Sequence, residues 1–134
     1  MDDHLRAKGE TVRREVLGDA YVDRAMDGAT VFSRPFQDVL NEYCWGMVWS
    51  DEALDRKQRS LINLGMLAAL GRMNEFRTHY RGAIRNGATQ EELCAAIVQI
   101  AVYCGVPAGV EAFRAANEVN ADLASERDAG SGSD

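Results

Sequence analysis

The sequence of 134 residues lacks the features of a membrane, secreted or nucleic-acid-binding protein. Its longest nearly apolar stretch, 95–110, is interrupted by Gln99, Gly105 and Pro107 and is too short to span a bilayer. The first four residues carry neither an apolar segment nor a cleavage signature. With 15 basic and 21 acidic residues the net charge is −6, and no basic stripe offers a surface to phosphates. We therefore expect a cytoplasmic protein whose partners include neither membrane nor nucleic acid.

Cysteine is also scarce. Cys44, Cys94 and Cys104 are widely spaced, and they form neither a Cys-x-x-Cys pair nor a cluster with metal-ligand spacing. This usage is typical of a reducing compartment and predicts no metal site. The chain also lacks a glycine-rich phosphate loop or any other cofactor signature. We expect it to work without a metal or a cofactor.

Only two prolines occur, and alanine, leucine, glutamate and arginine are frequent, which predicts helices throughout. Gly87 is expected to end a helix in a left-handed cap, and Thr89 and Glu92 form a capping box that opens the next helix. We expect a single-domain, all-α bundle over residues 1–124, followed by a disordered tail over 125–134. Its helices are predicted over 3–17, 21–28, 34–48, 55–70, 72–86, 89–104 and 107–123.

The segment 72–79 carries the strongest indication of chemistry. In a helix, Arg72, Glu75 and His79 share one face, so a cation, a carboxylate and an imidazole project together. The simpler interpretation is a solvated face with a Glu–His pair one turn apart. The flanking helices are strongly apolar, however, which places these three polar groups beside the core and favours a functional site.

Six motifs in this order carry a resemblance to a known family. They are Val12-Arg13-Arg14-x-Val16-Leu17-Gly18-Asp19, Phe32-x-x-x-Phe36-Gln37-Asp38, Trp45-Gly46-x-x-Trp49, Arg59-Ser60-Leu61-Ile62, Arg72-x-x-Glu75-x-x-x-His79 and Tyr103-Cys104-Gly105-Val106-Pro107-Ala108. Each motif alone is weak, but together they are specific. Over about residues 8–122 the sequence resembles the 4-carboxymuconolactone decarboxylases.

The resemblance implies a helical bundle of the alkylhydroperoxidase-like type and a homo-oligomer, either a trimer or a hexamer. The alkylhydroperoxidases of the wider family carry Cys-x-x-Cys-x-x-x-His on the same helix. When that histidine is aligned with His79, the two cysteines fall on Arg72 and Glu75. Thiol peroxidase chemistry needs a nucleophilic and a resolving sulfur, so this branch of the family is disfavoured.

The implied activity is the cofactor-independent decarboxylation of 4-carboxymuconolactone to the 3-oxoadipate enol-lactone, in protocatechuate breakdown. The substrate is a small lactone with two carboxylates. When one leaves as CO₂, the ring double bond passes the electron pair to the lactone carbonyl, so the substrate is its own electron sink. The protein must anchor the retained carboxylate, stabilise charge on the lactone oxygen, and protonate the neighbouring carbon.

The candidate site residues follow from these tasks. Arginine pairs bidentately with a carboxylate, so Arg72, Arg59 and Arg34 are the candidates for substrate binding, with a structural salt bridge as the alternative for each. His79, with an ordinary pKa near ~6.5, is the expected acid or base. Glu75 is expected to orient the imidazole or to exchange the proton itself.

Trp45 and Cys104 complete the expected substrate-binding set, with packing in the core as the alternative for both. Just before Trp45, where many relatives are expected to have a histidine, this chain has Tyr43 and Cys44. Two further hypotheses stay open. The same scaffold could act on another small lactone or keto acid, or the chain could be a non-catalytic helical subunit whose apolar faces serve assembly.

Overall fold

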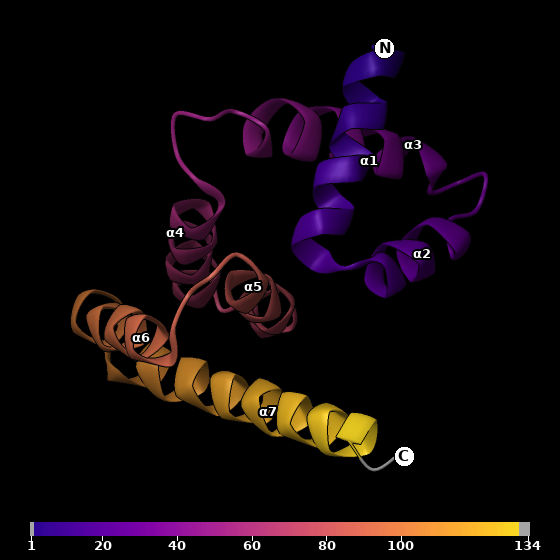
Figure 1. Ribbon diagram of the computed structural model, residues 1–134. Helices are drawn as coiled ribbons and strands as arrows, with labels where there is room; N and C mark the ends of the chain where they lie inside the picture. The colour runs from indigo at the N-terminus through magenta and orange to yellow at the C-terminus, as the bar shows by residue number, and fades with distance from the viewer. Residues whose placement is uncertain (1, 132–134) are drawn as a thin grey trace. The chain divides into compact units, whose positions relative to one another are not determined.

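The computed structural model describes residues 2–131, and these form helices without any strand, which confirms the all-α prediction. The helices are α1 (Asp3–Leu17), α2 (Asp19–Asp27), α3 (Arg34–Val39), the π-helix η1 (Leu40–Trp49), α4 (Arg56–Ala69), α5 (Met73–Arg85), α6 (Gln90–Cys104) and α7 (Val106–Ser131), as Figure 1 shows. Among these described residues, no helix is both long and apolar enough to cross a bilayer.

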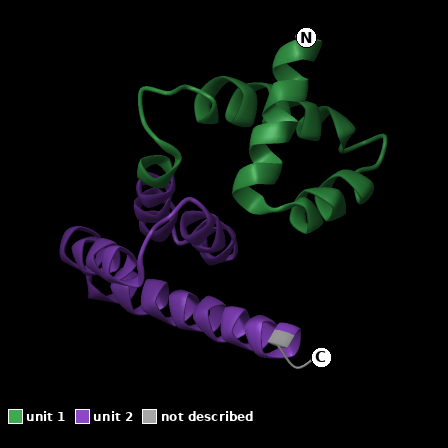
Figure 2. Cartoon of the chain, viewed as in Figure 1, with its two compact units in different colours: residues 1–59 green, residues 60–134 purple. Residues whose placement is uncertain are grey.

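The chain divides into two compact units, 1–59 and 60–134, as Figure 2 shows. That residues 1–124 form a single domain stays a prediction. Each unit has a hydrophobic core of its own. The first core contains Val12, Val16, Leu17, Val22, Trp45 and Trp49. The second contains Leu64, Ala68, Phe76, Tyr80, Ala83, Ala88, Leu93, Ile97, Ile100, Ala112, Ala115, Ala116 and Val119.

In the first unit α1 packs very closely on η1 through two glycines. A Cβ atom on Gly9 would lie 1.6 Å from the carbonyl oxygen of Asn41, and one on Gly46 would lie 2.5 Å from the carbonyl oxygen of Leu5. The two backbones can approach this closely only because both positions lack a side chain. The helix predicted over 34–48 is present, but it is an α-helix only to Val39 and then widens into a π-helix, a rare form that occurs often at functional sites.

Buried polar side chains also join α1 to α3 and η1. Arg13, only 4% exposed, donates from Nη1 to Gln37 Oε1 at 2.9 Å and to Asn41 Oδ1 at 3.1 Å, and burial lowers its pKa. Glu42, 3% exposed, accepts a hydrogen bond from the backbone nitrogen of Asp2 at 2.7 Å. These bonds fasten α1 to α3 and η1.

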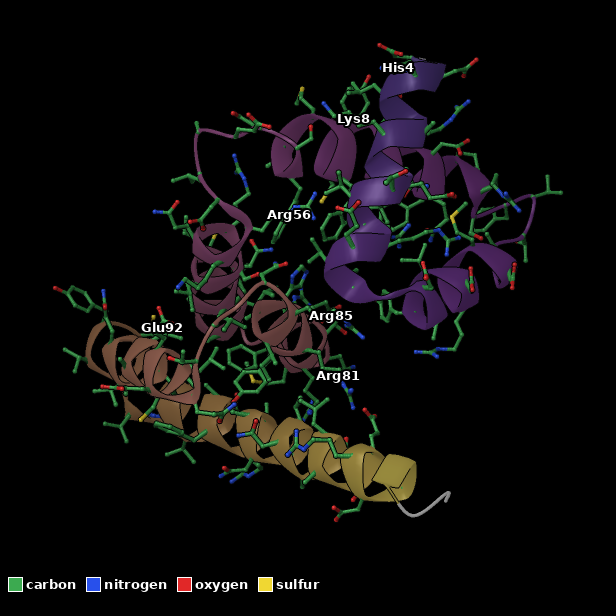
Figure 3. All side chains as sticks on the ribbon, in the orientation of Figure 1. His4, Lys8, Arg56, Arg81, Arg85 and Glu92 are labelled. Carbon is green, nitrogen blue, oxygen red and sulfur yellow. The ribbon has the colours of Figure 1, made fainter. Side chains whose placement is uncertain are left out.

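In the second unit α5 packs on α7. The hydroxyl of the buried Tyr80 donates to Asn120 Oδ1 at 3.0 Å. On the surface Arg77 pairs with Glu118 at 2.7 Å, and Arg81, labelled in Figure 3, pairs with Glu126 at 3.1 Å. Exposed ion pairs of this kind stabilise a fold only slightly, so most of the packing energy comes from the apolar core.

The prediction of a disordered tail from residue 125 is wrong over 125–131, because α7 continues to Ser131. Ala124, Glu126 and Arg127 are good helix formers, and the Glu126 carboxylate accepts hydrogen bonds from Arg81. That contact with Arg81 also lowers the pKa of Glu126. The last part of the predicted tail, 132–134, lies outside the described residues.

Candidate active site

A tight turn before α5 sets the position of the site's first residue. Gly71 has a φ of +71°, and the backbone nitrogen of Arg72 donates to the carbonyl of Leu67 at 2.9 Å. Arg72 thus becomes the N-cap residue of α5, with its side chain exposed. The end of α4 and the glycine turn therefore fix the residue predicted to bind a carboxylate.

From this cap the predicted face continues along α5. Glu75 lies in the first turn and is exposed, whereas His79 is half-buried one turn later. At a rise of about 1.5 Å per residue, Glu75 and His79 lie about 6 Å apart along the helix axis. The Glu75 carboxylate acts on the His79 imidazole from one turn away on α5, and Arg72 lies at the N-cap of the same helix.

Burial changes the acidity of the imidazole. Next to His79 along α5 lie Phe76 and Tyr80, which are 0% and 1% exposed. Desolvation lowers the pKa of His79 to about 4, and the carboxylate of Glu75 opposes this shift only in part. The imidazole of the free chain is therefore neutral at pH 7, which corrects the expectation of a pKa near the ordinary value.

A residue that the sequence analysis missed lies beside the imidazole. Asn63 Nδ2, on α4, is 3.4 Å from His79 Nδ1, which is a long hydrogen bond. When the amide donates, Nδ1 is the acceptor and Nε2 carries the proton of the neutral ring. The signal in the sequence is a single amide among apolar neighbours, Leu61-Ile62-Asn63-Leu64.

Arg59 and Arg34 belong to the first unit, 1–59. The guanidinium of Arg59 donates from Nη2 to the carbonyl of Asp51 at 2.9 Å, and its side chain is 13% exposed. It therefore fastens the loop before α4, as expected of a structural arginine. Arg34 lies exposed at the start of α3.

Trp45 also belongs to the first unit and packs in its core. It is 4% exposed, and its ring lies 4.9 Å from that of Trp49, centroid to centroid. This supports the packing alternative for Trp45 over contact with a substrate.

Cys104 is exposed at the end of α6, where it lines a groove of about 600 Å³ between α4 and α6. The other residues of this groove are Leu61, Ile62, Gly65, Glu92, Ala95, Ala96, Gln99, Ile100 and Tyr103. His79 is not among the residues that line this groove. Over residues 2–131, no three His, Cys, Asp or Glu side chains are grouped so that they could hold a metal ion.

A comparison with known proteins shows which family the chain belongs to. Residues 34–118 match the model of the "Carboxymuconolactone decarboxylase family", which is well over half of the chain. The chain belongs to this family. The matched region contains the whole of α5 with Arg72, Glu75 and His79, as well as Asn63.

Two curated relatives carry the names of decarboxylases. The chain is 41% identical to "4-carboxymuconolactone decarboxylase" of Acinetobacter baylyi, over 92% of each chain. It is 46% identical to "Nitrosuccinic acid decarboxylase npaB" of Metarhizium robertsii, over 79% of this chain and 74% of the relative. Both names support a carboxy-lyase within the family.

Proposed function

We propose that this protein decarboxylates 4-carboxymuconolactone to the 3-oxoadipate enol-lactone without a cofactor. The observation that carries the proposal is the face of α5, where an exposed guanidinium, an exposed carboxylate and a half-buried imidazole follow one another within two helical turns. The similarity to the Acinetobacter enzyme over nearly the full length of both chains supports the choice of substrate.

The reaction needs little from the protein beyond charge and a proton. The bond between the ring carbon and its carboxylate breaks, CO₂ leaves, and the electron pair moves through the ring double bond to the lactone carbonyl. The resulting dienolate accepts a proton at the carbon next to that carbonyl, which gives the enol-lactone. A cation that grips the remaining carboxylate and a group that delivers one proton are therefore the essential parts.

Arg72 is the best placed of the three arginines for the first part. Its side chain is exposed, and its backbone is fixed by the turn at Gly71. The guanidinium of Arg59 already holds the Asp51 carbonyl. We assign the bidentate contact with the substrate carboxylate to Arg72 for this reason.

We assign the proton transfer to His79, whose imidazole becomes protonated only when the substrate is bound. The free imidazole is neutral at pH 7, since its pKa is about 4. A bound dianion adds negative charge beside the ring, and nearby negative charge raises a histidine pKa, as Glu75 already does in part. The imidazole thus takes up a proton as the substrate binds and returns it to the dienolate.

A second candidate substrate is nitrosuccinic acid, because the Metarhizium relative is 46% identical to this chain. Nitrosuccinate also has two carboxylates, and its nitro group can accept the electron pair left by CO₂ as a nitronate. It would need the same carboxylate anchor and the same proton donor. The wider coverage of the Acinetobacter relative, 92% of each chain, favours the lactone.

The two candidate substrates can be distinguished by supplying each one to the purified protein and measuring the CO₂ that is released. The lactone reaction also changes the ultraviolet absorbance as the conjugated ring becomes an enol-lactone. CO₂ from the lactone supports the first proposal, and CO₂ from nitrosuccinate alone supports the second. CO₂ from neither would overturn both proposals and leave two hypotheses, another small lactone or keto acid as substrate and a non-catalytic assembly subunit.

A further inference from the structure

From Ser60 onwards α4 is apolar except for two polar side chains, and both of them bond to α5. Over 60–71 the sequence has no Asp, Glu, Lys or Arg, and its polar side chains are Ser60 and Asn63. Asn86, at the end of α5, donates from Nδ2 to Ser60 Oγ at 2.9 Å. Asn63 Nδ2 lies 3.4 Å from His79 Nδ1. Two amides thus join the same two helices, and one of them does so at the imidazole.

The fold of α4 gives no reason for an amide at position 63. Asparagine is a poorer helix former than leucine, and the neighbours of Asn63 in the sequence are Ile62 and Leu64. Asn63 is half-buried, and Leu64 beside it is 0% exposed. A polar group withdrawn from water costs free energy unless it is hydrogen-bonded. The contact with His79 therefore accounts for this amide better than packing does.

The partner of one ring nitrogen decides which nitrogen of a neutral imidazole carries the proton. The neutral ring has one N–H donor and one acceptor. The Glu75 carboxylate, on the same helix, acts on the His79 ring through its charge and raises its pKa. Asn63, on α4, is uncharged and bonds to Nδ1 alone, so its effect is to select the tautomer with the proton on Nε2.

We propose that Asn63 is a positioning residue of the decarboxylation, which holds Nδ1 of His79 and thereby makes Nε2 the nitrogen that hands the proton to the dienolate. The transfer itself rests on the proposed function. The tautomer of the free protein does not, because it follows from the contact between Asn63 and His79 and can be measured without a substrate.

An amide suits this role because it can bond to the ring in both protonation states. In the free protein Nδ2 donates to the lone pair on Nδ1. When the substrate binds, Nδ1 takes up a proton from solvent, and rotation of the amide about its last torsion presents Oδ1 as the acceptor. The Nε2–H bond then breaks, its electron pair stays on Nε2, and the proton forms the new C–H bond of the product. Loss of the proton on Nδ1 and uptake of one on Nε2 restore the resting ring.

The first test reads the tautomer without a substrate. Long-range ¹H–¹⁵N NMR on protein labelled with ¹⁵N-histidine shows which ring nitrogen is protonated. His4→Gln assigns the signals, because His4 is the other histidine. At pH 7 we expect a proton on Nε2 of His79 and none on Nδ1. A ring protonated on Nδ1, or a mixture of the two tautomers, overturns the proposal.

A matched pair of variants separates positioning of the ring from support of the fold. Asn63→Leu and Asn86→Leu each remove one amide that joins α4 to α5. Asn63→Leu should give a mixture of tautomers and lower kcat at least ~10-fold, a part of the usual general-acid contribution, with little change in KM. Asn86→Leu should keep the tautomer and the kcat of the wild type, whatever its Tm.

Two outcomes of this comparison overturn the proposal. One is the wild-type tautomer in Asn63→Leu, and the other is an equal loss of kcat in both variants, which would make Asn63 a support of the fold. An inactive wild type that has the expected tautomer would instead refute the proposed function and leave the contact between Asn63 and His79 established.

Asn63→Asp keeps the proposal testable if the leucine variant does not fold. A carboxylate only accepts, so the proton should move to Nδ1, and its charge should raise the pKa of His79 above the value of about 4. Asn86→Asp places the same charge about two turns after His79 on α5 and should leave the tautomer unchanged. NMR titration of both variants measures tautomer and pKa together. An unchanged tautomer and pKa in Asn63→Asp overturn the proposal.

Discussion

His79 lies one turn after Glu75 on α5, and burial and the Glu75 carboxylate shift the pKa of its imidazole in opposite directions. Burial beside the core favours the neutral ring, whereas the Glu75 carboxylate favours the charged ring. Burial has the larger effect, and the pKa falls to about 4. The same burial that prepares the ring for a negatively charged substrate therefore reduces the stability of the free protein in mild acid.

This relationship predicts how stability depends on pH. Between the unfolded pKa of ~6.5 and the folded value of about 4, the unfolded chain binds more protons at His79, so the free energy of unfolding falls as the pH falls through this window. The loss has an upper bound of about 3 kcal/mol. Denaturant unfolding of His79→Gln at pH 7 and pH 4.5 should show a smaller loss than the wild type.

His4→Gln is the control for this measurement, because His4 is the other histidine and is exposed on α1. Its pH dependence should follow the wild type. A wild-type loss that His79→Gln leaves unchanged would show that other groups titrate in this window.

Removal of the imidazole should impair the reaction without unfolding the protein. His79→Ala is expected to keep its helical circular dichroism and to lose ~10²–10⁴-fold in kcat, the usual contribution of a general acid or base. Turnover above half of the wild-type value would exclude His79 from the mechanism.

Substitution of Arg72 should change the kinetics, whereas substitution of Arg59 should change the thermal stability. Arg72→Lys keeps the charge but cannot form the bidentate fork, so we expect a loss of ~1.5–3 kcal/mol in transition-state binding, which is roughly 10–150-fold in kcat/KM, with an unchanged Tm. Arg59→Lys removes the hydrogen bond to the Asp51 carbonyl and should lower Tm instead. Kinetics and thermal unfolding measured together on both variants decide the assignment, and the opposite pattern would move the substrate contact to Arg59.

Chelators and thiol reagents give a further prediction. Treatment with a metal chelator is expected to leave turnover unchanged, since the proposed reaction uses no metal. Alkylation of the three free cysteines should also have little effect. A loss of activity on alkylation that Cys104→Ser abolishes would instead make Cys104 a substrate-contact residue, as the sequence first indicated.

Local sequence signals predicted much of the fold. The capping box of Thr89 and Glu92 is formed, and Gly87 has a φ of +95° at the end of α5, as expected. The first helix was predicted over 3–17, and α1 has these bounds. Such signals depend on a few neighbouring residues, so they can be recognised without knowledge of tertiary contacts.

Features that depend on tertiary packing were not predicted. The π-helix at 40–49 accompanies a backbone approach of α1 at Gly9 and Gly46, which helical spacing alone does not reveal. Within the site, spacing predicts that Arg72, Glu75 and His79 share a face, whereas the lowered pKa of His79 and its contact with Asn63 depend on burial and on a second helix, which spacing does not reveal.

The most direct test of the proposed function is a carbon balance on the purified protein with 4-carboxymuconolactone as substrate and no added cofactor. We predict one CO₂ released for each lactone consumed, with the absorbance change of enol-lactone formation and with His79→Ala as the inactive folded control. If the lactone stays intact while circular dichroism shows that the wild-type protein is folded, the chain is not the proposed lactone decarboxylase.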